Sequence, residues 1–74
     1  MSLKKELAKK ITVVEKEIQE LEGKLMRSMT ALVDALVSKR EPPEKDLHFF
    51  RKYTSEIEFK RAKLIDMVER LKYM

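Results

Sequence analysis

Two pairs of carboxylates in the sequence have a spacing that could bind a divalent metal ion. Glu17 and Glu20 lie three residues apart, and so do Asp66 and Glu69. Facing acidic pairs on helices hold Mg²⁺ or two metal ions in some helical bundles, provided that the carboxylates converge inside the bundle. Here Glu20 and Glu69 fall outside the apolar stripe of each helix and beside lysines, where charged side chains are solvated. We therefore expect no metal site.

Arg61 lies inside an otherwise apolar helical stripe. A guanidinium in that position needs a carboxylate partner, for which Glu17, Glu22 and Glu58 are candidates. The pattern favours a paired arginine at the edge of the stripe over an arginine that grips a ligand. The single histidine, His48, is expected to point outward, and no serine or threonine has a histidine or buried aspartate within helical reach. We expect no catalytic residue, no cofactor and no small-molecule substrate.

One cluster of helix-breaking residues, Lys39-Arg40-Glu41-Pro42-Pro43, divides the chain. Pro43 suits the first position of a helix, because the N–H that it lacks would have no partner there. The acidic Glu44 and Asp46 follow where a helix dipole is positive, and two cations precede the prolines where it is negative. The pattern predicts a single domain of two helices that run antiparallel. We expect helices over about 3–39 and about 43–73, with a turn over about 40–42.

Apolar residues in both segments recur at alternating intervals of three and four, which predicts a heptad seam in each helix. Ser28 and Thr54 are expected to lie level with each other. They could form a polar layer that fixes the register, or bond to carbonyls of their own helices. The expected fold is all-α, an antiparallel, coiled-coil-like hairpin of two helices. The predicted seams are Leu7, Ile11, Val14, Ile18, Leu21, Leu25, Ser28, Leu32 and Ala35 in the first helix, and Leu47, Phe50, Thr54, Ile57, Arg61, Leu64, Val68 and Leu71 in the second.

Composition excludes several classes of protein. The chain has 74 residues and is 43% hydrophobic, with one glycine, two prolines and no cysteine. It is too apolar for a disordered segment, too poor in turn residues for a β-sandwich, and has no disulfide framework. No run of about 18 apolar residues that could cross a membrane occurs. The first residues lack the apolar core of a signal peptide, so a cytoplasmic location is expected.

The segment Met26–Val37 holds only two charged residues in a chain that is 41% charged. On a helix its apolar groups would cover most of the circumference, and such a helix must be buried by several neighbours. A chain this small cannot supply them alone. We therefore expect self-association into a four-helix bundle, with a homodimer favoured. The expected interface comprises Met26, Met29, Leu32, Val33, Leu36, Val37, Phe49, Phe50, Tyr53, Ile57 and Leu64.

The formal net charge is +4, and two groups of cations depart from the alternating surface charges. In an antiparallel hairpin we expect the two groups to lie well apart, although a dimer could bring copies together. The favoured hypothesis is a non-enzymatic oligomerisation module, with a further protein partner possible. The alternative is a small basic regulator that binds RNA or DNA. Its expected contacts are Lys4, Lys5, Lys9 and Lys10 in the first helix and Arg51, Lys52, Lys60 and Lys63 in the second.

Overall fold

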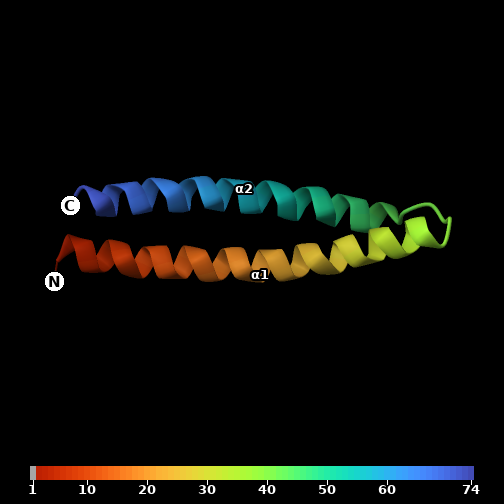
Figure 1. The fold of residues 1–74 in the computed structure, drawn as a ribbon, viewed down its shortest axis with the longest axis horizontal. Coiled ribbons are helices and arrows are strands. Elements are labelled where there is room, and N and C mark those ends of the chain that lie inside the picture. Colours follow the sequence, from red (N-terminus) through yellow and green to blue (C-terminus); the bar gives the residue numbers. More distant parts are fainter. Residues whose placement is uncertain (1) are drawn as a thin grey trace.

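The computed structural model describes residues 2–74 as two long α-helices joined by a short turn (Figure 1). Helix α1 comprises Leu3–Val37 and helix α2 comprises Glu44–Lys72. The helices lie side by side and run antiparallel, so that both ends of the chain are at one end of the molecule (Figure 1). The hairpin is 56 Å long and 16 by 15 Å across. The predicted all-α hairpin is confirmed, and residues 2–74 contain no strand.

Helix α1 ends two residues before its predicted end. Lys39 has a left-handed backbone with φ 56°, and two hydrogen bonds close the last turn. The N–H of Arg40 donates to the carbonyl of Ala35 at 2.8 Å, and the N–H of Lys39 donates to that of Leu36 at 3.1 Å. This pair of bonds is the Schellman motif that terminates many helices. The left-handed position usually holds glycine, so the sequence did not mark Lys39 as the residue at which the helix stops.

Helix α2 begins one residue later than predicted, because Pro43 is the cap rather than the first helical residue. The N–H groups of Asp46 and Leu47 both donate to the carbonyl of Pro43 at 3.1 Å. Acidic residues occupy the first turn and basic residues, Arg70 and Lys72, the last. Both sets suit the helix dipole, as the sequence predicted for the first turn.

The seam predicted for α1 is confirmed. Among its members, Val14, Ile18, Leu21, Ser28 and Ala35 are buried. Leu7, Ile11, Leu25 and Leu32 are half-buried. The core of the hairpin is therefore one continuous line of contact between two helices. It is thin, since no large side chain in residues 2–74 has an exposed fraction below 2%.

The seam predicted for α2 is wrong at two positions of its second half, Arg61 and Val68, and is confirmed at Leu64 and Leu71. Met67 is 6% exposed and packs in the core, whereas Val68 is 48% exposed. The seam instead follows Tyr53, Ile57, Lys60, Leu64, Met67 and Leu71, all of them buried or half-buried. Both patterns alternate between three and four residues, and the sequence favoured the one without Lys60. Lys60 fits because its long apolar stem covers the seam while its ammonium group reaches a carboxylate.

Thr54 makes no polar layer with Ser28. Its hydroxyl donates to the carbonyl of Phe50 in the same helix at 2.7 Å. Of the two alternatives, the bond back to its own helix is therefore confirmed for Thr54.

Candidate interaction surfaces

One side of the hairpin carries exposed apolar side chains along the half of α1 that is nearer the turn. Met26, Met29, Val33 and Leu36 have exposed fractions of 64%, 42%, 52% and 64%. Their spacing of three, four and three residues places them on one side of the helix. Isolated exposed apolar residues are normal, but a continuous group of them marks a contact surface.

Helix α2 contributes to the same side. A shallow groove joins Met26 and Met29 of α1 to Thr54, Glu58 and Arg61 of α2. Positions four and seven residues beyond Arg61 share its side of the helix, and they hold Ile65 and Val68, which are 60% and 48% exposed. We call this side the methionine face. Its members are Glu22, Met26, Met29, Val33 and Leu36 of α1 and Leu47, Thr54, Glu58, Arg61, Ile65 and Val68 of α2.

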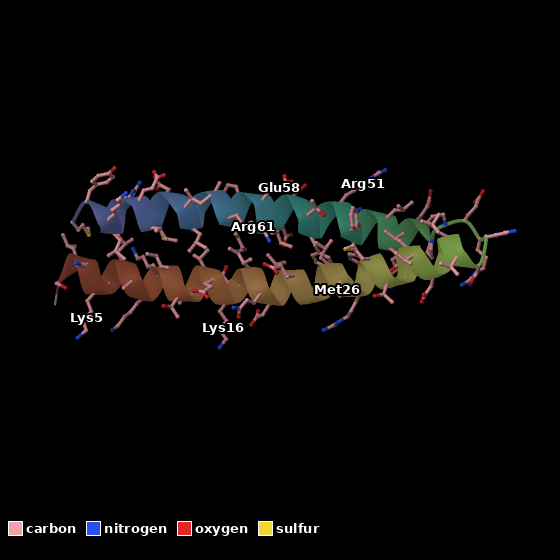
Figure 2. The ribbon with its side chains drawn as sticks, viewed as in Figure 1. Lys5, Lys16, Met26, Arg51, Glu58 and Arg61 are labelled. Carbon is pink, nitrogen blue, oxygen red and sulfur yellow. The ribbon has the colours of Figure 1, made fainter. Side chains whose placement is uncertain are left out.

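An ion pair lies near the middle of the methionine face. The guanidinium Nη2 of Arg61 is 3.3 Å from Oε1 of Glu22, and the two side chains are 59% and 48% exposed. Figure 2 shows Arg61 over the space between the helices, whereas Glu58 and Arg51 project at the outer edge of α2. Glu22 was one of three partners expected for Arg61. The guanidinium has five N–H donors, so this contact leaves most of them available.

The predicted interface residues differ in exposure, and they are exposed, buried or half-buried in the structure. Met26, Met29, Val33 and Leu36 come together on the methionine face, and Val37 is 77% exposed at the end of α1. Ile57 is 4% exposed, inside the core of the hairpin. The remaining members are half-buried, namely Leu32, Phe49, Phe50, Tyr53 and Leu64.

Seven members of the methionine face were absent from the predicted interface, namely Glu22 of α1 and Leu47, Thr54, Glu58, Arg61, Ile65 and Val68 of α2. The sequence does contain a signal for four of them. Leu47, Thr54, Arg61 and Val68 recur every seven residues. These four residues also belong to the seam predicted within the hairpin. The sequence therefore did not predict that they are accessible to another molecule.

The opposite side of the hairpin carries a basic groove. We call it the lysine groove. Its lining consists of Lys9, Lys10 and Lys63, one carboxylate, Glu17, and the apolar Val13, Val14 and Met67. It lies opposite the methionine face for a geometric reason. Each step along a helix turns by about 100°. Val13 directly precedes the seam residue Val14 and so lies to one side of the seam. Met26 directly follows the seam residue Leu25 and so lies to the other side.

The expectation that the two basic groups lie well apart is wrong for these lysines. Antiparallel pairing brings the start of α1 beside the second half of α2, which places Lys9 and Lys10 next to Lys63. The other predicted nucleic-acid contacts are not in this groove. Lys4, Lys5, Arg51 and Lys52 are exposed elsewhere, and Figure 2 shows Lys5 and Arg51 projecting from opposite edges of the hairpin.

Lys60 lies beside the lysine groove but is engaged by Glu17. Its ammonium group donates a hydrogen bond to the Glu17 carboxylate. This bond and the positive charge of Lys60 hold the pKa of Glu17 below its ordinary value, and the charge of Lys63 adds to the effect. The three other lysines of the region are thus left facing the groove.

Aromatic side chains gather near the turn. The rings of Phe49 and Tyr53 stack with their centroids 5.8 Å apart, and the ammonium of Lys24 lies 6.0 Å from the Tyr53 ring. Both rings are half-buried, as expected for packing between the helices. Phe59 is 73% exposed, and His48 is also exposed, as predicted.

Within residues 2–74 no three metal-binding side chains come together, and neither helix is long and apolar enough to cross a membrane. Comparison of the chain with known protein families, curated proteins and solved structures gives no match. The methionine face and the lysine groove are the two surfaces of the hairpin that suit contact with another molecule.

Proposed function

We propose that the chain is a non-enzymatic helical interaction module that works as a homodimer. Two hairpins would pack through their methionine faces into a four-helix bundle. The observation that carries this proposal is the exposure of Met26, Met29, Val33 and Leu36 on one side of α1. An apolar surface of this kind, bordered by charged residues, is typical of a protein–protein contact.

The thin core of the hairpin supports the same proposal. A single line of contact between two helices buries little apolar surface, and small domains with little core need an additional source of stability. The chain has no cysteine that could form a disulfide. A second copy would cover the methionine face and supply the missing contacts. Folding would then be coupled to association, and the thermal midpoint should rise with protein concentration.

Val33→Glu tests the proposal directly. Val33 is 52% exposed in the hairpin, so the new carboxylate is tolerated in a single copy. In the dimer it would be buried without a partner, which costs about 3 kcal/mol and weakens association about a hundredfold. Thr30→Glu is the control, because Thr30 lies two residues from both Ser28 and Leu32 and so faces away from the seam.

The measurement is sedimentation equilibrium, with far-UV circular dichroism to monitor helix content. We expect a dimer for the wild type and for Thr30→Glu, and a helical monomer for Val33→Glu at the same concentration. A monomeric wild type, or a Val33→Glu variant that remains fully dimeric, would contradict the proposal.

The lysine groove favours a second candidate function, binding of RNA or DNA. Three lysines that converge without an equal number of carboxylates can contact backbone phosphates. Binding through them predicts a slope of about −2.7 for log K against log salt on duplex DNA. Lys9→Gln with Lys63→Gln should reduce this slope by about two thirds, whereas Lys16→Gln should leave it unchanged. Absence of binding at low salt would exclude this function.

A further inference from the structure

We infer that the second copy docks with its turn at the same end as the turn of the first, so that Arg61 of each copy pairs with Glu22 of the other. This inference rests on the proposed homodimer and specifies its geometry. Two copies can bring their methionine faces together in two regular ways. A two-fold axis along the length of the hairpin puts both turns at one end, and an axis across it puts them at opposite ends.

The distribution of apolar residues along α1 distinguishes the two arrangements. On the methionine side, the half of α1 nearer the turn presents Met26, Met29, Val33 and Leu36. The other half presents Ala8, Glu15 and Glu22, which continue the seven-residue track of Met29 and Leu36 toward the start of the chain. That side of α1 is therefore apolar at one end and polar at the other.

With the turns at opposite ends, α1 lies against α1 of the other copy in reverse. The apolar half of each α1 would then face the polar half of its counterpart, with Met29 and Val33 near Glu15. With the turns at one end, α1 lies against α2 of the other copy. Ile65 and Val68 then face the half of α1 that carries Glu15, and the apolar half of α1 faces the half of α2 nearer the turn. Met26 and Val33 would face the track that begins with Leu47 and Thr54 of the second copy.

The charges near the middle of the face make the same distinction. A two-fold axis along the hairpin leaves the position of each residue along that axis unchanged. Two residues that lie at the same height within one copy therefore also lie at the same height in different copies. Glu22 and Arg61 are level, since they form an ion pair 3.3 Å apart within the chain. Glu22 would therefore also meet Arg61 of the second copy. A crosswise axis at the middle of the hairpin, where the two copies overlap over their whole length, brings Glu22 near Glu22 and Arg61 near Arg61, and like charges oppose association.

The exposure of the pair shows that a second contact is available. The Arg61 and Glu22 side chains are 59% and 48% exposed and share one contact. An arginine with free donors can bind a second carboxylate in a geometry that fixes register. Four side chains, two from each copy, would form a closed ring of alternating charge in the middle of an apolar interface.

A distance measurement between the two turns tests the arrangement. The chain has no native cysteine, so Glu41→Cys in the exposed turn accepts a single spin label. Pulsed dipolar spectroscopy should give a distance of about 30 Å or less between the labels of a dimer with its turns at one end. Turns at opposite ends would separate the labels by nearly the 56 Å length of the hairpin. Dilution with unlabelled protein is the control and should remove the dipolar signal.

A charge-reversal pair tests the ionic contact itself. Glu22→Arg carries two facing arginines and Arg61→Glu carries two facing glutamates, so each variant repels itself both within and between copies. In the mixed dimer, arginines of one copy face glutamates of the other. Residues 22 and 61 within each chain still carry like charges, so opposite charges meet only between copies. In an equimolar mixture, native mass spectrometry should show about tenfold more mixed dimer than the two homodimers together, whereas random pairing gives equal amounts.

The outcomes separate this inference from the proposed function. A dimer with a long label distance, or a statistical mixture of the charge variants, overturns the same-end arrangement and leaves the homodimer standing. A wild-type monomer in sedimentation overturns both. A short distance together with preferential mixing supports the arrangement and assigns Arg61 its second partner.

Discussion

Lys60 of α2 donates a hydrogen bond to the carboxylate of Glu17 in α1 from a position inside the seam, between Ile57 and Leu64. The two side chains are 30% and 42% exposed. The core of the hairpin therefore includes a charged contact that water still reaches. Such a contact adds little to stability at neutral pH compared with the apolar residues around it, but it makes stability depend on pH.

Glu17→Gln should reduce the acid sensitivity of the hairpin. Lys60 lowers the pKa of Glu17 in the folded state, first by the hydrogen bond and then by its charge. A carboxylate whose folded pKa is lowered stabilises the fold above its unfolded pKa, and this stability is lost as the pH falls through the folded pKa. In urea melts, the free energies of unfolding of wild type and Glu17→Gln should therefore converge as the pH falls from 7 to about 3.

The control for this prediction is Glu20→Gln, the same change at an exposed carboxylate one turn away. It should leave the pH profile close to that of the wild type. A Glu17→Gln profile that runs parallel to the wild type across the whole acid range would show that the ion pair has no part in pH dependence.

Lys39→Gly should stabilise the hairpin. Lys39 has a left-handed backbone, with φ 56°, at the position of the Schellman motif where glycine is favoured. A side chain with a Cβ atom is strained in this conformation, and glycine is not. We expect a gain of about 0.5–1 kcal/mol in the free energy of unfolding. Lys39→Ala keeps the Cβ atom and should give no such gain. Equal effects of the two variants would assign the change to the lost charge.

The overall fold could be predicted from the sequence because its signals were local. The prolines marked the turn, and the seam of α1 runs along the whole helix, whereas the second apolar pattern, from Met26 to Leu36, covers only the half nearer the turn. The seam of α2 could be predicted only at the residues that its two candidate tracks share, Ile57, Leu64 and Leu71, because the tracks have the same periodicity and run side by side. The choice between Met67 and Val68 depends on whether Lys60 or Arg61 lies nearer the partner helix. That question depends on contacts between residues far apart in the sequence, such as the pairing of Lys60 with Glu17, which is 43 residues distant.

The same pairing explains why the surfaces were predicted only in part. The apolar residues of α1 form one sequence segment, so the first half of the methionine face was visible. Its second half depends on the rotation of α2 about its own axis. The lysine groove joins residues more than 50 positions apart, and only the register of the hairpin brings them together.

Met67→Ala should cost more than Val68→Ala in the stability of the hairpin itself. Met67 is 6% exposed and packs in the core, whereas Val68 is 48% exposed. Truncation of a buried methionine costs about 2 kcal/mol or more, and an exposed substitution about 0.5 kcal/mol or less. The urea melts need the lowest practical protein concentration, because Val68 lies on the face assigned to the second copy. A larger loss of unfolding free energy for Val68→Ala under these conditions would show that Val68, as the sequence predicted, and not Met67 belongs to the seam.

Gly23→Ala should stabilise α1 without changing association. Gly23 lies inside the helix, and a Cβ atom added there meets no other atom within 4 Å. An interior glycine costs a helix about 1 kcal/mol relative to alanine, chiefly through the conformational entropy of the unfolded chain. We expect the free energy of unfolding to rise by about this amount, measured by urea melts at fixed protein concentration. Sedimentation of the variant should give the same mass as the wild type. A smaller mass would mean that a second copy packs closely against Gly23, and the interface would then have to extend beyond the methionine face to the outer side of α1.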